Sequence, residues 1–395
     1  MERRKSLGQT HVTSRETSRL GLDLGRKIGL LDPSTKPTAS DIYDTGKWDK
    51  LHHEFVVVDS YAAAVDLDAL QRGRVDVVIQ ALQAEEILAQ IPPQPPSELP
   101  PNGLKIWEHV FEGADLVERV LQVIDEHLQF LEAYNEYIEL ALTKSDVQRI
   151  AQSGKIALVM MLASGIINND LEVLRQYYQW GIRVMALCHL GSVGWADSNA
   201  EIKEIPGLTD FGREVVKTCN EMGILIDLSH ASDQTCWDAL DVATKPIIST
   251  HAKCRALTNS PRDLSDDLMR AIAETGGVVG ILAPAPRTSA ESQQARLKRD
   301  RRLAERYTNP FALAATKLAD AEIWGTKLDL ESINHAVNLV GIDHVCLASH
   351  FQNVPQWKEF TESLIEHGYS EADARKILGE NVLRVLQQTI GKSES

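Results

Sequence analysis

Short, continuous apolar runs recur along the chain and predict buried β-strands. Each run has four to six residues and is rich in β-branched side chains, so it is too short for a stable helix. Longer segments with helical spacing of apolar residues separate several of them, for example residues 170–180 and 233–243. The eight runs are Phe55–Asp59, Val75–Ile79, Ile156–Met161, Ile182–Leu187, Ile224–Leu228, Pro246–Ser249, Gly277–Leu282 and His344–Ala348.

The alternation of these runs with helical segments predicts an α/β fold, a (β/α)8 TIM barrel in a single domain. Strands that are joined through helices run parallel and are covered on both faces, which explains their continuous apolar character. The length of 395 residues suits such a barrel with insertions. We expect the barrel over residues 46–390, between a polar N-terminal extension (1–45) and a flexible tail (391–395).

Two stretches depart from this alternation. The proline-rich residues 91–101 break regular structure and are expected to form a surface crossing or a lid. Residues 104–142 carry apolar side chains at helical spacing and predict one long amphipathic helix. Core packing accounts for that helical pattern without any further function.

Four of the predicted strands are followed closely by a histidine, namely His189, His230, His251 and His350. The carboxyl ends of parallel strands meet at one mouth of a barrel, where ligands bind and catalysis takes place. Imidazole is a frequent zinc ligand and a general acid or base near neutral pH. The pattern therefore favours a divalent-metal site at this mouth, while the alternative is that the histidines are structural.

Carboxylates, the usual companions of histidine at a metal, are scarce near these strand ends. Asp59 ends the first predicted strand, and Asp227 precedes His230 by three residues. They are the only acidic candidates that the strand pattern brings to the mouth.

Charge and composition narrow the classes of partner. The formal net charge of −15 argues against nucleic acid or an anionic membrane surface as a partner. No apolar run reaches the roughly 18 residues that cross a bilayer, and residues 1–19 lack the apolar stretch of a secretory signal. The five cysteines are scattered without a Cys-x-x-Cys pair, as expected for buried thiols in a reducing compartment. We therefore expect a cytoplasmic protein.

Several separated motifs occur in an order and spacing that resemble the membrane (renal) dipeptidase family, peptidase family M19. They are Gly207–Lys217, Gly223–Ser232, Pro246–His251 and Asn259–Arg262, and the resemblance covers roughly residues 46–390. It implies a (β/α)8 amidohydrolase, usually a homodimer, that cleaves dipeptides with two zinc ions bridged by a glutamate. Carried over residue by residue, His230 and His251 match two metal ligands, whereas His189 and Arg262 match the substrate-binding pair.

The chain departs from the family pattern at the other functional positions. Where the family has Asp-Gly-His-Asn-Asp, this sequence has Asp59-Ser-Tyr61-Ala-Ala63, so both ligands of the first strand are missing. In our alignment the bridging glutamate corresponds to Leu162, and the aspartate after the eighth strand corresponds to His350. Without the bridging carboxylate, two dications about 3.5 to 4 Å apart would repel each other with little compensation. We therefore expect at most one zinc ion, with His350 as a third ligand.

Three functions remain open at this point. The first is a hydrolase with one metal that acts on a small dipeptide-like or carboxylated substrate, held by His189 and Arg262. The second is a metal-free, repurposed enzyme, such as a lyase, an isomerase or a biosynthetic tailoring enzyme. In it, His350 is the catalytic acid or base and Tyr61 supplies a hydroxyl to the substrate. The third is a pseudoenzyme that binds a ligand without turnover.

Overall fold

The computed structural model describes residues 47–63, 65, 67–82, 116–189, 191–199, 206–286, 324–350 and 357–391. The expected N-terminal extension, the proline-rich segment and residues 392–395 of the expected tail lie outside the described residues. The strands are β1 (Val58–Ala62), β2 (Val77–Leu82), β3 (Ile138–Leu140), β4 (Ile156–Leu162), β5 (Ile182–Ala186), β6 (Leu225–Asp227), β7 (Ile248–Ala252), β8 (Val278–Leu282), β9 (Pro284–Pro286), β10 (Trp324–Leu328) and β11 (Val345–Ala348).

Helices precede and follow most of these strands. They are α2 (Lys47–His53), α3 (Leu67–Arg72), α5 (Leu116–Ala133), α6 (Lys144–Gln152), α7 (Leu171–Gln179), α8 (Asp210–Met222), α9 (Asp233–Val242), α10 (Arg255–Thr258), α11 (Asp266–Glu274), α14 (Leu330–Val340), the 3-10 turn η5 (Ile342–His344), α15 (Trp357–His367), α16 (Glu371–Arg375), the π-helical turn η6 (Lys376–Glu380) and α17 (Asn381–Thr389). No helix among the described residues is both long enough and apolar enough to cross a bilayer.

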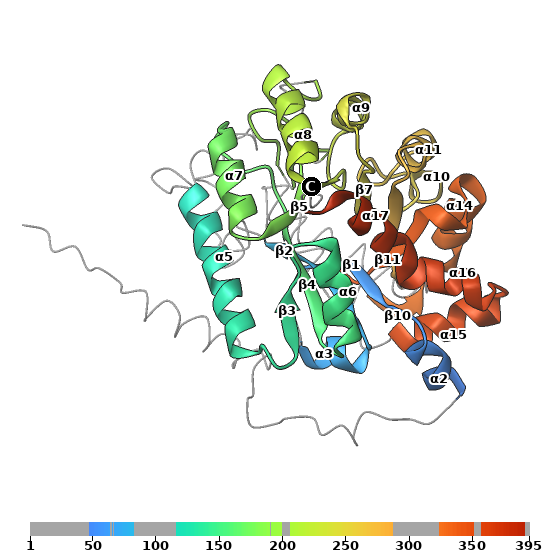
Figure 1. Cartoon of the computed structure of the whole chain (residues 1–395). Helices are drawn as coiled ribbons and strands as arrows, with labels where there is room; N and C mark the ends of the chain where they lie inside the picture. Colours follow the sequence, from blue (N-terminus) through green and yellow to red (C-terminus); the bar gives the residue numbers. More distant parts are fainter. Residues whose placement is uncertain are drawn as a thin grey trace, which may run out of the picture. The chain divides into compact units, whose positions relative to one another are not determined.

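Eight parallel strands follow one another in the order β1-β2-β4-β5-β6-β7-β8-β11. The last strand returns to the first, because the Ala63 N–H donates to the carbonyl of His350 at 2.9 Å and the His350 N–H donates to the carbonyl of Tyr61 at 3.0 Å. Helices surround the strands (Figure 1). The predicted (β/α)8 barrel is confirmed, and each of the eight predicted strands overlaps an observed one.

The single long helix predicted over residues 104–142 is wrong in its second half. Helix α5 ends at Ala133, and Ile138–Leu140 form the short strand β3, which pairs in parallel with β4. Pairing with the barrel sheet outweighs the helical spacing of the apolar residues, since local pattern is a weaker determinant than tertiary hydrogen bonding. Residues 104–115 lie outside the described part.

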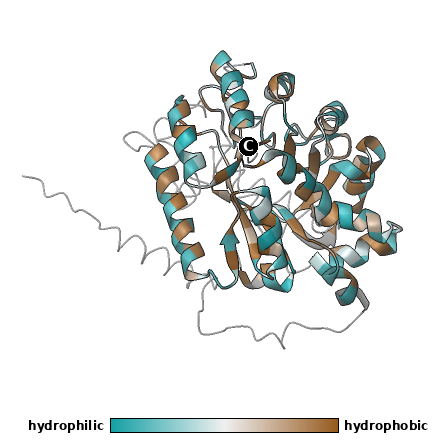
Figure 2. Cartoon of the chain, viewed as in Figure 1, coloured by the Kyte–Doolittle hydropathy of each residue, from teal (hydrophilic) through white to brown (hydrophobic). Residues whose placement is uncertain are grey.

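Alternate residues of the strands separate into an inner and an outer apolar layer. On β4, Met161 and the following Ala163 belong to the cluster inside the barrel, whereas Leu162 belongs to the cluster between the strands and the helices. This is the period of two that a strand buried on both faces requires. The apolar strands run through the interior of Figure 2, with polar positions on the outer helices.

Capping residues set the boundaries of the helices that lead to the candidate site. The Thr209 hydroxyl accepts the Gly212 N–H at the start of α8, and Gly223, with φ of 82°, ends that helix in the left-handed conformation. The Ser232 hydroxyl accepts the Thr235 N–H at the start of α9. Strand β6 and the turn that carries His230 therefore lie between two fixed helix ends.

A buried carboxyl group joins the first and last strands. Asp59 accepts hydrogen bonds from the backbone N–H groups of Ser349 and Tyr61, at 2.9 and 3.2 Å, and is bonded to the Ser349 hydroxyl. Burial raises the pKa of Asp59 from 3.8 to about 7, although the three hydrogen bonds oppose this. Asp59 is therefore a structural group of the barrel closure and does not face the mouth as a metal ligand.

The raised pKa of Asp59 predicts a pH dependence of stability. Because the folded-state pKa lies above the unfolded value, the contribution is fully present below about pH 4 and is lost as the pH rises through about 7. A difference of about three between the two pKa values corresponds to about 4 kcal/mol. The Asp59→Asn variant, which keeps a neutral acceptor, should lack this component, so its free energy of unfolding should fall less between pH 4 and 8. Urea unfolding at four pH values measures this, and parallel curves for the two proteins would refute it.

Candidate functional site

The four strand-end histidines form one continuous group at the mouth of the barrel. Ring centroids lie 4.4 Å apart for His189 and His230, 5.0 Å for His230 and His251, and 5.1 Å for His251 and His350. All four are buried. The predicted convergence of these histidines is confirmed, while the role of each one stays a prediction.

Backbone conformation directs two of these rings. His230 has φ of 69° and His350 has φ of 64°, both in the left-handed region. This conformation costs a residue with a Cβ about 1 to 2 kcal/mol, and such residues cluster at functional sites. The surrounding strand ends must therefore hold both turns in place.

A second buried carboxyl group lies beneath His230 and His251. Asp227 accepts the Thr250 hydroxyl at 2.7 Å, the Ser229 hydroxyl at 2.8 Å and the backbone N–H groups of both residues. Burial raises its pKa, against these hydrogen bonds. Asp227 thus fixes the residues that come directly before the two histidines, and it is not a metal ligand as the sequence suggested.

The Asp227 contact also sets the tautomer of His251. The Thr250 hydroxyl has one proton, which it donates to Asp227, so it accepts the bond from His251 Nδ1 at 2.9 Å. The neutral ring then directs the lone pair of Nε2 towards His230, whose Nε2 lies 3.0 Å away. Sequence reasoning missed Thr250 in this role.

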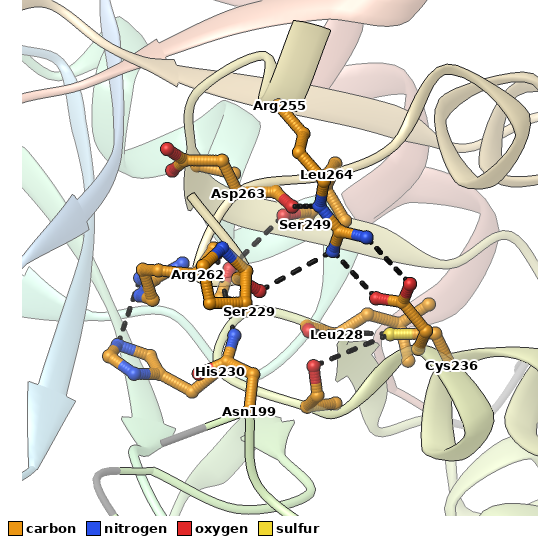
Figure 3. Close-up of a pocket in the computed structure, with 14 residues that line it drawn as sticks. Asn199, Leu228, Ser229, His230, Cys236, Ser249, Arg255, Arg262, Asp263 and Leu264 are labelled. Atoms are coloured by element: carbon orange, nitrogen blue, oxygen red, sulfur yellow. Dashed lines mark hydrogen bonds and ion pairs between the residues drawn. The ribbon is translucent and has the colours of Figure 1, made fainter. Parts of the chain in front are cut away.

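Tyr61 and Arg262 complete the group. The Tyr61 ring stacks on His251, with centroids 3.7 Å apart and planes at 27°, and lies 5.4 Å from the His350 ring. Arg262 Nη2 lies 3.0 Å from His230 Nε2 (Figure 3). It also donates to the carbonyl of His251 at 3.2 Å. Within the described part of the chain, no carboxylate forms an ion pair with Arg262. All six predicted site residues are therefore brought together.

A small pocket opens beside His230 and Arg262 and is drawn in Figure 3. Arg255 of α10 also lines it and makes a bidentate ion pair with Asp233, with both N–O distances at 2.7 Å. Asn199 contributes its side-chain N–H to the Arg262 carbonyl at 3.4 Å. Two arginines thus border the same pocket in different environments. Arg255 has a carboxylate partner, whereas Arg262 lies against His230.

Burial and a nearby cation keep three of the four imidazoles neutral. Burial, and then the positive charge of Arg262, lowers the pKa of His350 to about 3 and lowers the pKa values of His230 and His251 well below their usual range. Burial also lowers the pKa of the Arg262 guanidinium. At neutral pH these three rings are therefore uncharged, and the Arg262 guanidinium group lies beside them.

The residues present do not fit the two-zinc centre that the sequence resemblance implies. Among the described residues, no three His, Cys, Asp or Glu side chains are placed to hold a metal ion together, so the expected third ligand, His350, does not join His230 and His251. The alignment of the bridging glutamate with Leu162 is also wrong in register, because that side chain packs outside the barrel. The inward-facing neighbours, Met161 and Ala163, are not ligands.

The chain matches known proteins over most of its length. The model of the membrane dipeptidase family (peptidase family M19) matches residues 45–394. Dipeptidase tcpJ of Claviceps purpurea is 25% identical over 358 residues, which cover 86% of this chain and 74% of that protein.

Solved structures give the same assignment of fold. The probable dipeptidase PvdM from Pseudomonas aeruginosa superposes with a TM-score of 0.72 at 22% identity, covering 86% of this chain and 97% of PvdM. A metallo peptidase from Rhodobacter sphaeroides, solved with a phosphinate mimic of the dipeptide L-Ala-D-Ala, has a TM-score of 0.62 at 20% identity and covers 85% and 99% of the two chains. The family match establishes that the chain belongs to the membrane dipeptidase family, peptidase family M19.

Proposed function

We propose that this protein recognises a small, carboxylated, dipeptide-like molecule at the histidine mouth and hydrolyses ordinary dipeptides poorly. The observation that carries the proposal is Arg262, a cation without an ion-pair partner among the described residues, placed against neutral imidazoles. A guanidinium group pairs with a carboxylate through two parallel N–H donors. A ligand carboxylate would give Arg262 the ion-pair partner that the described residues do not supply.

The size and class of the ligand follow from the site and from the relatives. Four imidazoles and the Tyr61 ring gather at the mouth, so flat ring surfaces lie beside the Arg262 guanidinium group. Such a site suits a ligand with one carboxylate and a short, weakly polar remainder. The phosphinate dipeptide mimic bound by the related metallo peptidase supports a dipeptide-like shape.

The acid–base groups at the mouth are poorly matched to efficient hydrolysis. A general base works best when its pKa lies near the working pH, whereas burial and Arg262 lower the pKa of His350 to about 3. Asp59 has a pKa of about 7, but its carboxyl group is bonded within the β1–β11 closure. These values support binding with slow chemistry, in which His350 accepts a proton and Tyr61 offers a hydroxyl.

Ligand recognition should depend on a free carboxylate and on Arg262. We expect L-Ala-D-Ala to raise the melting temperature of the protein in proportion to ligand occupancy, and its C-terminal amide to bind at least about tenfold more weakly, since a charge-assisted pair contributes about 1.5 to 3 kcal/mol. In the Arg262→Gln variant the acid and the amide should bind equally weakly.

The matched control for this measurement is Arg255→Gln. It removes the same charge from the same pocket but from an arginine that already has a carboxylate partner, Asp233. Its preference for the acid should remain, provided that thermal unfolding confirms a folded variant. If the wild-type protein binds the amide as well as the acid, the carboxylate proposal fails.

Dipeptide hydrolysis by the unmodified protein should be close to background. We expect no release of amino acids above the buffer control from a panel of L,L- and L,D-dipeptides with added zinc, detected with ninhydrin. A variant that restores the family residues together, Tyr61→His, Ala63→Asp, Ala163→Glu and His350→Asp, should gain zinc-dependent turnover. Rapid turnover by the wild-type protein that disappears in His230→Ala would instead establish a plain hydrolase.

A further inference from the structure

One carboxylate closes the base of the loop that carries Arg262. This loop, residues 253–264, leaves strand β7 and includes the short helix α10. Asp263 accepts the backbone N–H of Lys253 at 3.1 Å and the Thr258 hydroxyl at 2.7 Å. Its side chain is buried, and it comes directly after Arg262 in the chain. Asp263 therefore ties the start and the middle of the loop to the position next to Arg262.

Backbone and guanidinium bonds complete the closure of this loop. The Leu264 N–H donates to the carbonyl of Lys253 at 3.1 Å, so the loop returns to the place from which it started. Arg262 Nη2 donates to the carbonyl of His251, a residue of β7, at 3.2 Å. Arg262 and Asp263 are neighbours in sequence, and both bond to the backbone at the end of the same strand.

We propose that Asp263 is a positioning residue, which holds Arg262 in place to receive the carboxylate of the ligand. This inference rests on the proposed function of Arg262 and adds the group through which the loop fixes that guanidinium. A loop that is ordered before binding loses less conformational entropy when the ligand arrives. Without the Asp263 carboxylate, the N–H of the buried Lys253 loses its acceptor, which is costly unless the loop rearranges.

The charge of Asp263 is the smaller part of this effect. Burial lowers the pKa of Arg262, whereas the nearby carboxylate of Asp263 raises it. An arginine keeps its charge in proteins without such help, so the carboxylate is not needed to make Arg262 a cation. The hydrogen bonds of Asp263, rather than its charge, should therefore determine how well Arg262 recognises a ligand.

The Asp263→Ala variant tests the positioning role. Binding of L-Ala-D-Ala and of its C-terminal amide is measured by isothermal titration calorimetry. We expect the preference of the wild-type protein for the acid, at least about tenfold, to fall to about threefold or less in Asp263→Ala. A crystal structure of the ligand-free variant should show Arg262 Nη2 beyond hydrogen-bond distance from the carbonyl of His251.

The conservative variant Asp263→Asn should restore the preference. Its amide oxygen still accepts the Lys253 N–H, and its amide nitrogen donates to the Thr258 hydroxyl. That hydroxyl can then donate to the carbonyl of Cys254, which lies 3.3 Å away. We expect the acid preference of Asp263→Asn to lie within about threefold of the wild-type value. A rescue of this kind separates the hydrogen bonds of Asp263 from its negative charge.

The matched control is Asp238→Ala. Asp238 and Asp263 are both 8% exposed, and Asp238 also accepts a backbone N–H, that of Leu208 at 2.8 Å. It lies on α9, however, and not in the loop that carries Arg262. A general loss of stability should weaken the acid and the amide alike, so Asp238→Ala should keep the acid preference within about twofold. If Asp263→Ala does not fold, Thr258→Val removes one of the two bonds and should show a smaller fall.

Two results would overturn the proposal. One is a folded Asp263→Ala protein, or Thr258→Val in its place, that keeps the full acid preference of the wild type. The other is a crystal structure of that variant in which Arg262 still donates to the carbonyl of His251. If the wild-type protein itself binds the acid and the amide equally, the proposed function fails. The ligand-free structure of the variant then still decides whether Asp263 positions Arg262.

Discussion

Two buried carboxyl groups hold the turns that carry the histidines of the mouth. Asp227 bonds to Ser229 and Thr250, and Asp59 bonds to Ser349. Each of these three hydroxyl residues comes directly before a histidine of the mouth. Buried carboxyl groups are costly unless they are hydrogen-bonded, so the hydroxyl and backbone donors that satisfy them also fix the strand ends. The geometry of the site depends on this support below the mouth.

The support holds the histidines close together through hydrogen bonds within the protein. In a metal site, the ion itself helps to hold its ligands in position. Here the turn of His230 is left-handed, and the ring of His251 is fixed through Thr250 to Asp227. Protein hydrogen bonds therefore hold these two residues in position. A constellation of this kind can persist while its chemistry changes.

The fold could be predicted from the sequence because the buried strands are short and apolar, and segments with apolar residues at helical spacing separate several of them. The site residues could be located because strand ends of a parallel barrel converge, as His189 and His350 illustrate. Strand β3 could not be predicted from the sequence, because its residues have helical spacing and only their pairing with β4 makes them a strand. Whether Leu162 points into the barrel or away from it could not be predicted without the strand register, because a shift of one residue moves the side chain to the other face.

The structural roles of the buried Asp59 and Asp227 could not be predicted from the sequence for a different reason. Near a histidine, an aspartate at a strand end has the same sequence signature whether it faces a metal or lies beneath the mouth. A hydroxyl residue precedes a histidine three times, in Ser229-His230, Thr250-His251 and Ser349-His350. This repeated pair was the available signal, because a hydroxyl beside a buried carboxyl group is its natural donor.

Tyr61 packs beside the histidines of the mouth. Its ring is 1% exposed and stacks on His251 at 3.7 Å. A stacked aromatic ring buries a large surface and contributes about 0.5 to 1.5 kcal/mol beyond burial. With Arg262 against His230, the two sides of the histidine pair thus have an aromatic ring and a cation as neighbours. This combination suits the carboxylated ligand that we propose, and it arises from packing and charge at the same residues.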